Sequence, residues 1–418
     1  MQFDVSYTKL KNGVRVLLVP MSGVESVSAM VLCKTGSRNE TLRQGGISHV
    51  LEHMVFKGTK KYPSPMHIAE AVDSIGAQQN AFTSKEYTGY YITSAAKHLG
   101  LTLDIQAEML TAPLLPQDDL TREREVIVEE INMYEDQPMS KASEEFENLM
   151  YDGSAMGRMI IGTKESVRAT TSKDLRKYMR RWYRGGNMLV VVAGKIANHK
   201  FSNSQIEEKF GGMKIGILDK YETQAKYGKA ENRHFKKKTE QAHFYMGVPG
   251  LSIQDPRRYA LQMGQVVLGG GMSSRLFNEI REKRGLAYYV KADLDMNFDC
   301  GYLGVRAGVN LDKLGEAMSV VKDEMLKLSD TITEAELAKA KEYILGHMPL
   351  SLEDSMGVAQ FFGTRALVLD EIRQPEEISK QITGVRIQDV KKILNELVSE
   401  EKIRSVVVGP KARGVVHW

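Results

Sequence analysis

The sequence predicts an α+β fold built from two homologous domains, each a mostly antiparallel sheet covered by helices. Three observations support this prediction. The 418 residues are too many for one core and suit two domains of about 200 residues. A strand and long helix, "TGYYITSAAKHLGLTLDIQAEML", recur in pattern as "DCGYLGVRAGVN" followed by "LDKLGEAMSVVKDEMLKL". The apolar strand "NMLVVVAGK" likewise recurs as "IRSVVVGPK", so we infer an internal duplication.

The first half begins with strands and then turns to helices. Alternating segments rich in β-branched and aromatic residues predict strands at 13–20, 24–36, 76–96 and 187–195. Helices are expected from about residue 46 and over 64–75, 99–111, 117–134 and 171–182.

The second half repeats this order after a polar, glycine-dotted segment. Its elements are a strand at 241–250, two helices around a glycine turn over 256–282, a strand at 299–310, a helix at 311–328 and a strand at 403–411. The predicted domains are therefore 1–212 and 233–418, joined by a linker at 213–232. Only the first domain has a close pair of histidines, so we expect catalysis there and a diverged copy in the second.

Composition excludes several classes of protein. The chain is 42% hydrophobic and 26% charged, as in ordinary globular proteins. Its net charge of +4 is spread along the chain, which argues against nucleic acid, and no apolar run is long enough to span a membrane. Cys33 and Cys300 lie far apart in apolar stretches and are expected to be buried thiols. A cytoplasmic protein is expected, unless a presequence has been removed.

The segment "GGISHVLEHMVFKGT", residues 45–59, is the strongest candidate site. On a helix, His49 and His53 lie on one face and could hold one metal ion, with Glu52 able to reach a water beside it. Zinc accepts imidazole nitrogens, and a catalytic zinc site uses three protein ligands with one position open. The alternative is a polar helix with two solvated histidines.

A third ligand is expected from "TREREVIVEEINMYEDQP". Glu123 and Glu130 are seven residues apart, two turns along one side of a helix, with Val126 and Ile127 between them. This spacing suits a partly buried stripe with a carboxylate at each end, and a buried carboxylate needs a partner such as a metal ion. Spacing alone does not separate Glu130 from Glu129.

These residues resemble a known family. His49-Val-Leu-Glu52-His53 is the inverted zinc motif H-x-x-E-H, and the wider segment resembles the signature of the pitrilysin, insulinase and mitochondrial processing peptidase family. That family has a Glu-x6-Glu helix about 77 residues after the second histidine, and here 130 − 53 = 77. The resemblance implies one zinc per chain held by His49, His53 and Glu130. It also implies Glu123 as a supporting carboxylate and Glu52 as general base, leaving Glu129 as the runner-up.

The segment "GAQQNAFTSKEYTGYY" resembles the family's active-site strand. The resemblance implies that Asn80 and Ala81 help to hold an extended substrate. An extended peptide can add to a free sheet edge, so that main-chain hydrogen bonds give affinity with little demand on sequence. The alternative is an ordinary strand in which Asn80 caps a turn.

The second half contains "GGGMSSRLFNEIREKRGLAYYV". Its glycines lack the Lys-Ser/Thr of a P-loop and the spacing of a dinucleotide fingerprint, which argues against a phosphate site. The resemblance implies that Arg281 and Tyr288 support the tetrahedral intermediate and bind substrate backbone, as two hydrogen-bond donors can. The alternative is a surface arginine and a core tyrosine.

The resemblance also implies an assembly and a function. Relatives with four such domains form two bowls that close into a chamber, so a two-domain chain is expected to form half of a clamshell. A homodimer is expected, because one chain carries both residue sets, and the alternative is a heterodimer with a related subunit. The expected function is a zinc-dependent metalloendopeptidase acting on peptides or unfolded segments. The alternatives are a non-catalytic structural or partner-binding subunit of the same fold and an unrelated zinc hydrolase of small molecules.

Overall fold

The computed structural model describes residues 2–196, 199–216 and 225–410. It divides into two compact units, each described here by itself. Unit 1 comprises Met1–Ile131, Arg158–Glu222 and His347–Glu376, and unit 2 comprises Asn132–Gly157, Thr223–Gly346 and Glu377–Trp418. The units thus differ from the contiguous division at 212 and 233, because a segment from each half of the chain packs in the unit formed mainly by the other half. Part of the expected linker, 217–224, lies outside the described residues.

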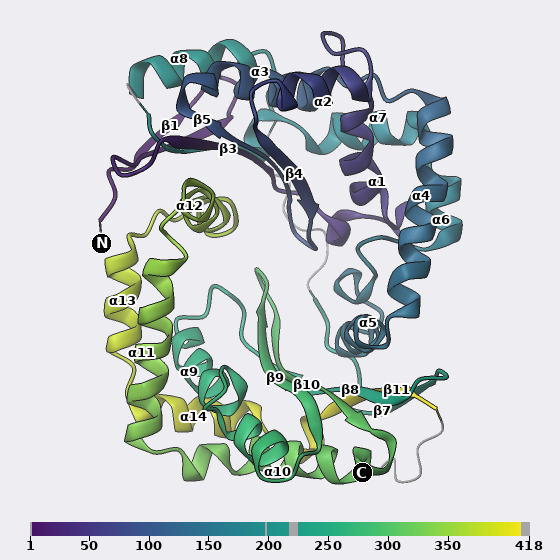
Figure 1. Cartoon of the computed structure of the whole chain (residues 1–418), viewed down its shortest axis with the longest axis vertical. Helices are drawn as coiled ribbons and strands as arrows, with labels where there is room; N and C mark the ends of the chain where they lie inside the picture. Colours follow the sequence, from purple (N-terminus) through teal and green to yellow (C-terminus); the bar gives the residue numbers. More distant parts are fainter. Residues whose placement is uncertain (1, 197–198, 217–224, 411–418) are drawn as a thin grey trace. The chain divides into compact units, whose positions relative to one another are not determined.

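Unit 1 contains a six-stranded sheet in the order β1-β2-β6-β3-β5-β4 (Figure 1). Its strands are β1 Ser6–Lys9, β2 Arg15–Pro20, β3 Ser26–Cys33, β4 Gln78–Thr83, β5 Thr88–Ala95 and β6 Met188–Gly194. All neighbours are antiparallel except β2 and β6. The segment predicted as strand over 76–96 is the hairpin β4–β5, closed by the turn at Ser84–Tyr87.

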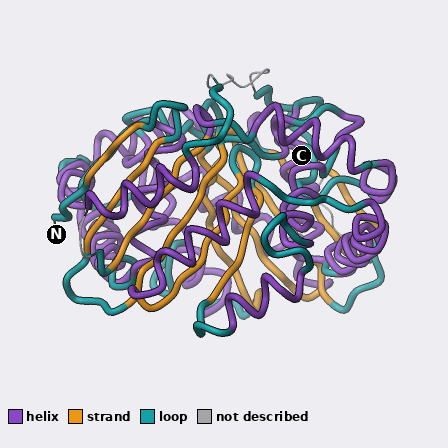
Figure 2. The backbone as a smooth tube through the Cα atoms, turned by 90° about the horizontal axis from the view of Figure 1, so that it is seen from above, coloured by secondary structure: helices purple, strands orange, loops and turns teal. Residues whose placement is uncertain are grey.

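Helices cover both faces of this sheet (Figure 1). Figure 2 shows the helices in purple and the strands in orange. The helices of the first half of the chain are α1 Ile47–Met54, α2 Pro65–Asp73, α3 Leu99–Thr111, α4 Gln117–Asp136, α6 Lys164–Ala169, α7 Ser172–Trp182 and α8 His199–Phe210. Helix α3 lies along one face, where Gln106 donates hydrogen bonds to the carbonyls of Ala29 and Tyr90.

The other face of the first sheet is covered by α12, Ser355–Leu369, which comes from the second half of the chain. Phe362, Ala366 and Leu367 of α12 pack against Met30, Leu32 and Val191 of the sheet in one buried cluster. Gly363 permits this approach, since a Cβ at that position would lie 2.8 Å from the Met30 side chain. The core of unit 1 is therefore complete only when this distant helix is in place.

Unit 2 contains a five-stranded sheet in the order β7-β11-β8-β10-β9. Its strands are β7 Asn232–Lys236, β8 Gln241–Pro249, β9 Ala287–Met296, β10 Gly301–Asn310 and β11 Arg404–Gly409. In chain order, β7 to β11 occupy the positions of β2 to β6, and the parallel pair β7–β11 matches β2–β6. This identical connectivity confirms the predicted duplication and α+β class. Residue 411, the end of the last predicted strand, lies outside the described residues.

Helices also cover both faces of the second sheet. The helices in the second half of the chain, apart from α12, are α9 Arg258–Gly269, α10 Leu314–Thr331, α11 Glu334–Leu350, α13 Pro375–Thr383 and α14 Ile387–Leu397. One face is covered by α5, Pro138–Met150, from the first half, whose Phe146 stacks on Tyr245 with ring centroids 4.2 Å apart. Helices α5 and α12 are therefore exchanged between the two repeats.

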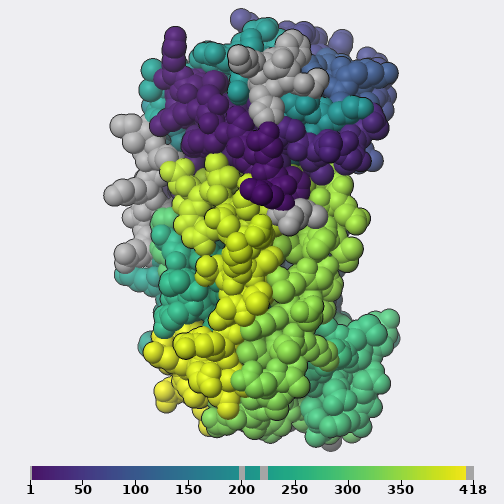
Figure 3. Space-filling view, turned by 90° about the vertical axis from the view of Figure 1, so that its left-hand side faces the viewer, coloured from purple at the N-terminus to yellow at the C-terminus, as the bar shows by residue number. Residues whose placement is uncertain are grey.

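The ends of unit 1 are joined by segments that lie far apart in the sequence. Near the N-terminus, whose residues are purple in Figure 3, Gln374 donates to the Phe3 carbonyl and accepts from the Phe3 amide. Cys33 and Cys300 are both buried thiols outside any disulfide, as predicted. None of the helices in the described part of the chain has the length and apolarity that a membrane crossing needs.

Candidate active site

The start of α1 is fixed by a buried carboxylate. Gly46, at the N-cap, has φ of +85°, and a Cβ there would lie 2.4 Å from the carbonyl oxygen of Ile161. The two carboxylate oxygens of Glu40 accept hydrogen bonds of 2.8 Å from the backbone N–H groups of Gly46 and Ser48. Glu40 therefore satisfies the first free donors of the helix and sets its direction.

Three expected metal ligands come together on this helix and α4. The rings of His49 and His53 lie 4.5 Å apart between centroids, on one face of α1. Glu130 of α4 brings its Oε2 atom to 3.7 Å from Nε2 of each histidine. One ligand atom from each of the three residues lies within 4.8 Å of the others, and the side chains are only 12–25% exposed.

The donor chemistry of this group fits a cation. His53 uses Nδ1 against Glu123, at 2.9 Å, which leaves a lone pair on Nε2. That lone pair and the carboxylate of Glu130 face each other at a distance too long for a hydrogen bond, an arrangement that a positive ion between them would satisfy. Zinc with tetrahedral ligands at about 2.1 Å needs ligand separations of about 3.4 Å. The distance from Glu130 to each histidine, 3.7 Å, is close to this value. Burial and the neighbouring His53 lower the pKa of His49 to about 3, so His49 is the neutral imidazole that binds metals.

The structure distinguishes the two glutamates that spacing left open. Glu130 faces the histidines, whereas Glu129 is exposed. The predicted partly buried stripe between Glu123 and Glu130 is confirmed only in part. Ile127 is fully buried, but Val126 is 54% exposed. Of these two residues, only Ile127 packs in the core.

Glu52 lies beside the group and is held by a residue of β4. The Thr83 hydroxyl donates a hydrogen bond of 2.5 Å to Glu52 Oε2. Burial raises the pKa of Glu52, and the nearby Glu130 adds to this, while Thr83 and His53 oppose it. A raised pKa favours a carboxylate that takes up and returns protons near neutral pH.

The strand β4 also offers a sheet edge. Within the described residues it pairs with β5 alone, and order in the sheet places it last. Asn80 and Ala81 lie in the middle of this strand, where the Asn80 Oδ1 accepts a hydrogen bond from the Ala81 N–H. Asn80 is thus part of the strand and does not cap a turn. The Thr83–Glu52 hydrogen bond shows that this edge strand adjoins the helix that carries the histidines.

Arg281 and Tyr288 lie together in unit 2. Arg281 is on the π-helical turn Phe277–Glu282 and Tyr288 on β9, and the guanidinium lies 5.6 Å from the tyrosine ring centre. Tyr288 is 78% exposed, so it is not a core tyrosine. A π-helical turn is rare and often found at functional sites. The catalytic and substrate-binding roles of the pair stay predictions.

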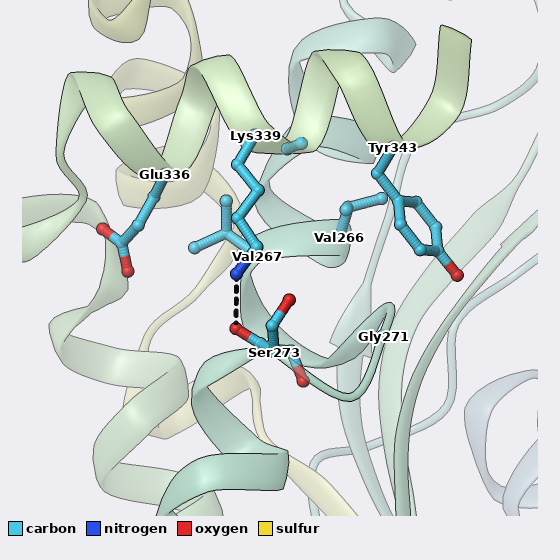
Figure 4. A pocket seen from close by; sticks show the side chains of 9 residues that line it. Val266, Val267, Gly271, Ser273, Glu336, Lys339 and Tyr343 are labelled. Carbon is cyan, nitrogen blue, oxygen red and sulfur yellow. Dashed lines mark hydrogen bonds between the residues drawn. The ribbon is translucent and has the colours of Figure 1, made fainter. Parts of the chain in front are cut away.

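Side chains of α11 contact the glycine-rich turn at residues 269–273, which precedes Arg281. Tyr343 donates to the Gly270 carbonyl at 3.0 Å. Lys339 donates to the Ser273 carbonyl at 3.0 Å (Figure 4). A Cβ at residue 271 would lie 3.1 Å from the Tyr343 ring, which explains the glycine there. The pocket between them has a volume of about 40 Å³, room for a few water molecules, so a phosphate cradle finds no support here.

Comparison with known proteins identifies the family of the chain. Residues 15–164 match the family described as insulinase (peptidase family M16), and residues 169–344 match the peptidase M16 inactive domain. The chain belongs to peptidase family M16. The H-x-x-E-H segment lies in the part that matches the insulinase description, and Arg281 and Tyr288 lie in the part that matches the M16 inactive domain. The candidate metal group His49, His53 and Glu130 thus lies in the part that matches the insulinase description.

The M16 relatives cover nearly the whole chain. A Bacillus subtilis protein named an uncharacterized zinc protease is 36% identical, over 94% of this chain and 95% of its own. A Streptomyces coelicolor protein of the same description is 34% identical, over 97% of this chain and 90% of its own. The crystal structure of a protease from Helicobacter pylori has a TM-score of 0.91 and 25% identity, over 98% of this chain and 100% of its own.

Sequence reasoning did not identify Glu40, Lys57 or Thr83 as residues of this M16 site. Glu40 and Thr83 reach the zinc motif only through long-range packing. Lys57, four residues after His53, carries a signal that could have been noticed, because His49, His53 and Lys57 recur at the helical spacing of four.

Proposed function

We propose that this M16 protein is a zinc metalloendopeptidase that hydrolyses peptides or unfolded segments. The observation that carries the proposal is the convergence of His49, His53 and Glu130, with Glu52 beside them. When bound, zinc supplies Lewis acidity that polarises a carbonyl and acidifies a water molecule. The relatives named zinc proteases support the choice of metal.

The residues of this chain then have distinct tasks. Glu52, with one oxygen held by Thr83, takes the proton of the attacking water and returns it to the departing amine. Glu123 accepts a hydrogen bond from Nδ1 of His53 and keeps Nε2 free for the metal. The free edge of β4, at Asn80 and Ala81, binds the substrate as an added strand.

The test is cleavage of a quenched peptide of about a dozen residues containing lysine and arginine, a length suited to binding as a strand. We expect cleavage to stop on removal of metal by a chelator and to return on addition of zinc. Cleavage that is unaffected by the chelator would refute a metallopeptidase. A zinc-loaded protein that cleaves no peptide would favour a non-catalytic subunit.

We also propose that the chain acts as a homodimer, a clamshell in which Arg281 and Tyr288 of one subunit serve the zinc site of the other. This rests on the presence of both residue sets in one chain. The test is to mix two inactive variants, Glu52→Gln and Arg281→Ala. If Arg281 serves the other subunit, the mixed dimer has one complete site and activity returns. If Arg281→Ala is inactive and mixed dimers restore no activity, Arg281 acts within its own chain. If Arg281→Ala is fully active, Arg281 has no role in cleavage.

A further inference from the structure

Lys57 lies behind the candidate zinc site and contacts a residue that itself contacts a ligand. Its Nζ lies 2.5 Å from Glu123 Oε2, and the other oxygen of Glu123 lies 2.9 Å from Nδ1 of His53. A cation and an imidazole thus hold the two oxygens of one carboxylate. The series runs from Lys57 through Glu123 and His53 to the metal-binding group.

The sequence explains how one helical face supplies both ends of this series. Helix α1 ends at Met54 and continues as the 3₁₀ turn Val55–Lys57. His49, His53 and Lys57 therefore lie one turn apart along the same face. Glu123, on α4, contacts both His53 and Lys57.

The Lys57–Glu123 pair differs from the ion pairs of the surface. The side chain of Lys57 is 24% exposed and that of Glu123 is 12% exposed, whereas Lys195 and Glu25 in another pair are 50% and 88% exposed. Burial alone would raise the pKa of Glu123, but hydrogen bonds from His53 and Lys57 lower it. A pair so covered by protein is less screened than an exposed one.

The geometry also bears on which glutamate binds the metal. Glu123 and Glu130 are both carboxylates on the same helix and both lie beside His53. The second oxygen of Glu123 is engaged by Lys57, so Glu123 is turned toward Nδ1 of His53 and away from the metal position. Glu130 is left as the third ligand.

We propose that Lys57 is a positioning residue that fixes Glu123 as the hydrogen-bond acceptor of His53 and keeps it from becoming a metal ligand. This inference rests on the proposed zinc site. Loss of Lys57 would free Glu123 to rotate, so His53 would lose its fixed orientation and zinc affinity would fall.

The experiment measures zinc affinity by competition with a chromophoric chelator, using the full chain and zinc ion alone. We expect Lys57→Met to weaken zinc binding about tenfold and Lys57→Arg to restore most of it. Lys61→Met is the matched control, because Lys61 also forms a 2.5 Å ion pair, but with Asp104 on α3. Its zinc affinity should stay within about twofold of that of the unmodified protein.

A double-mutant cycle separates positioning from a general effect of charge. In a chain carrying Glu123→Gln, the added Lys57→Met substitution should cause no further loss of zinc affinity. Lys57→Gln serves as the second neutral variant if Lys57→Met does not fold, as judged by thermal unfolding without metal. Unchanged zinc affinity in the neutral variant, or an equal loss in Lys61→Met, would overturn the inference. An unmodified chain that binds no zinc would instead refute the proposed function.

Discussion

The Thr83 hydroxyl holds one oxygen of Glu52. Glu52 is not one of the three candidate metal ligands, His49, His53 and Glu130. A substitution of Glu52 therefore tests its proposed role in proton transfer without removing a metal ligand. The substitution Glu52→Gln keeps the size of the side chain and removes its ability to accept a proton.

We expect Glu52→Gln to retain zinc and to lower kcat by a factor of about 10²–10⁴, the usual contribution of a general acid–base residue. Metal analysis and steady-state kinetics on the same sample provide the measurement. A variant that kept most of its turnover would remove Glu52 from this role.

Glu130 and Glu129 are a natural matched pair, since they are adjacent, chemically identical and differ in exposure. Glu130→Gln should lose most of its bound zinc and its activity, because a neutral amide is a poor zinc ligand. Glu129→Gln should retain both. Equal zinc content in the two variants, measured after dialysis, would contradict Glu130 as a ligand.

The residues of the zinc motif were predictable because helical spacing places His49, Glu52 and His53 without knowledge of the rest of the chain. Spacing alone could not decide whether Glu129 or Glu130 is the third ligand. Only the family resemblance favoured Glu130. Thr83 and Glu40 were missed because a hydroxyl on a strand and a carboxylate in a loop carry no local sign of their distant partners.

At the scale of elements, α1 depends on Glu40, which lies outside it. Burial raises the pKa of the Glu40 carboxyl to about 7, although the hydrogen bonds from Ser48 and Gly46 oppose this shift. Because the folded-state pKa is above the unfolded value, the folded state binds more protons than the unfolded state between about pH 4.5 and 7. The contribution of Glu40 to stability therefore falls as the pH rises through this window and is constant above it.

We expect the free energy of unfolding of the native chain, relative to that of Glu40→Gln, to fall by up to about 3 kcal/mol between pH 4.5 and 7. The glutamine does not titrate, so subtraction removes the effect of all other groups. Urea unfolding at several pH values provides the measurement. A difference between the two proteins that does not change with pH would contradict the raised pKa.

Most strands of the two sheets were predictable from alternation and apolar runs, but β1, β7 and β9 were not expected. The packing partners of the helices were not predictable either. The apolar residues of α12 indicate that it is buried and do not say against which sheet. The same holds for α5. Their exchange depends on the whole chain, since each packs on the sheet of the other repeat.

At the scale of the whole molecule, this exchange means that the first half of the sequence is not an independent unit. We expect a fragment of residues 1–212 to bind a hydrophobic dye and aggregate, because the face that α12 covers, with Met30, Leu32 and Val191, would meet water. A fragment that carries residues 347–376 on a flexible linker should bind much less dye. Equal dye binding by the two fragments would contradict the packing of α12.

Helix α12 also sets a delay during synthesis on the ribosome. The last strand of the first sheet ends at Gly194 and α12 begins at Ser355, so 355 − 194 = 161 residues must be added before the covering helix begins to emerge. At roughly 5–20 residues per second, this takes roughly 8–32 s. Throughout that interval the nascent sheet has an apolar face open to wrong partners, and a chaperone that shields such a face would be most needed then.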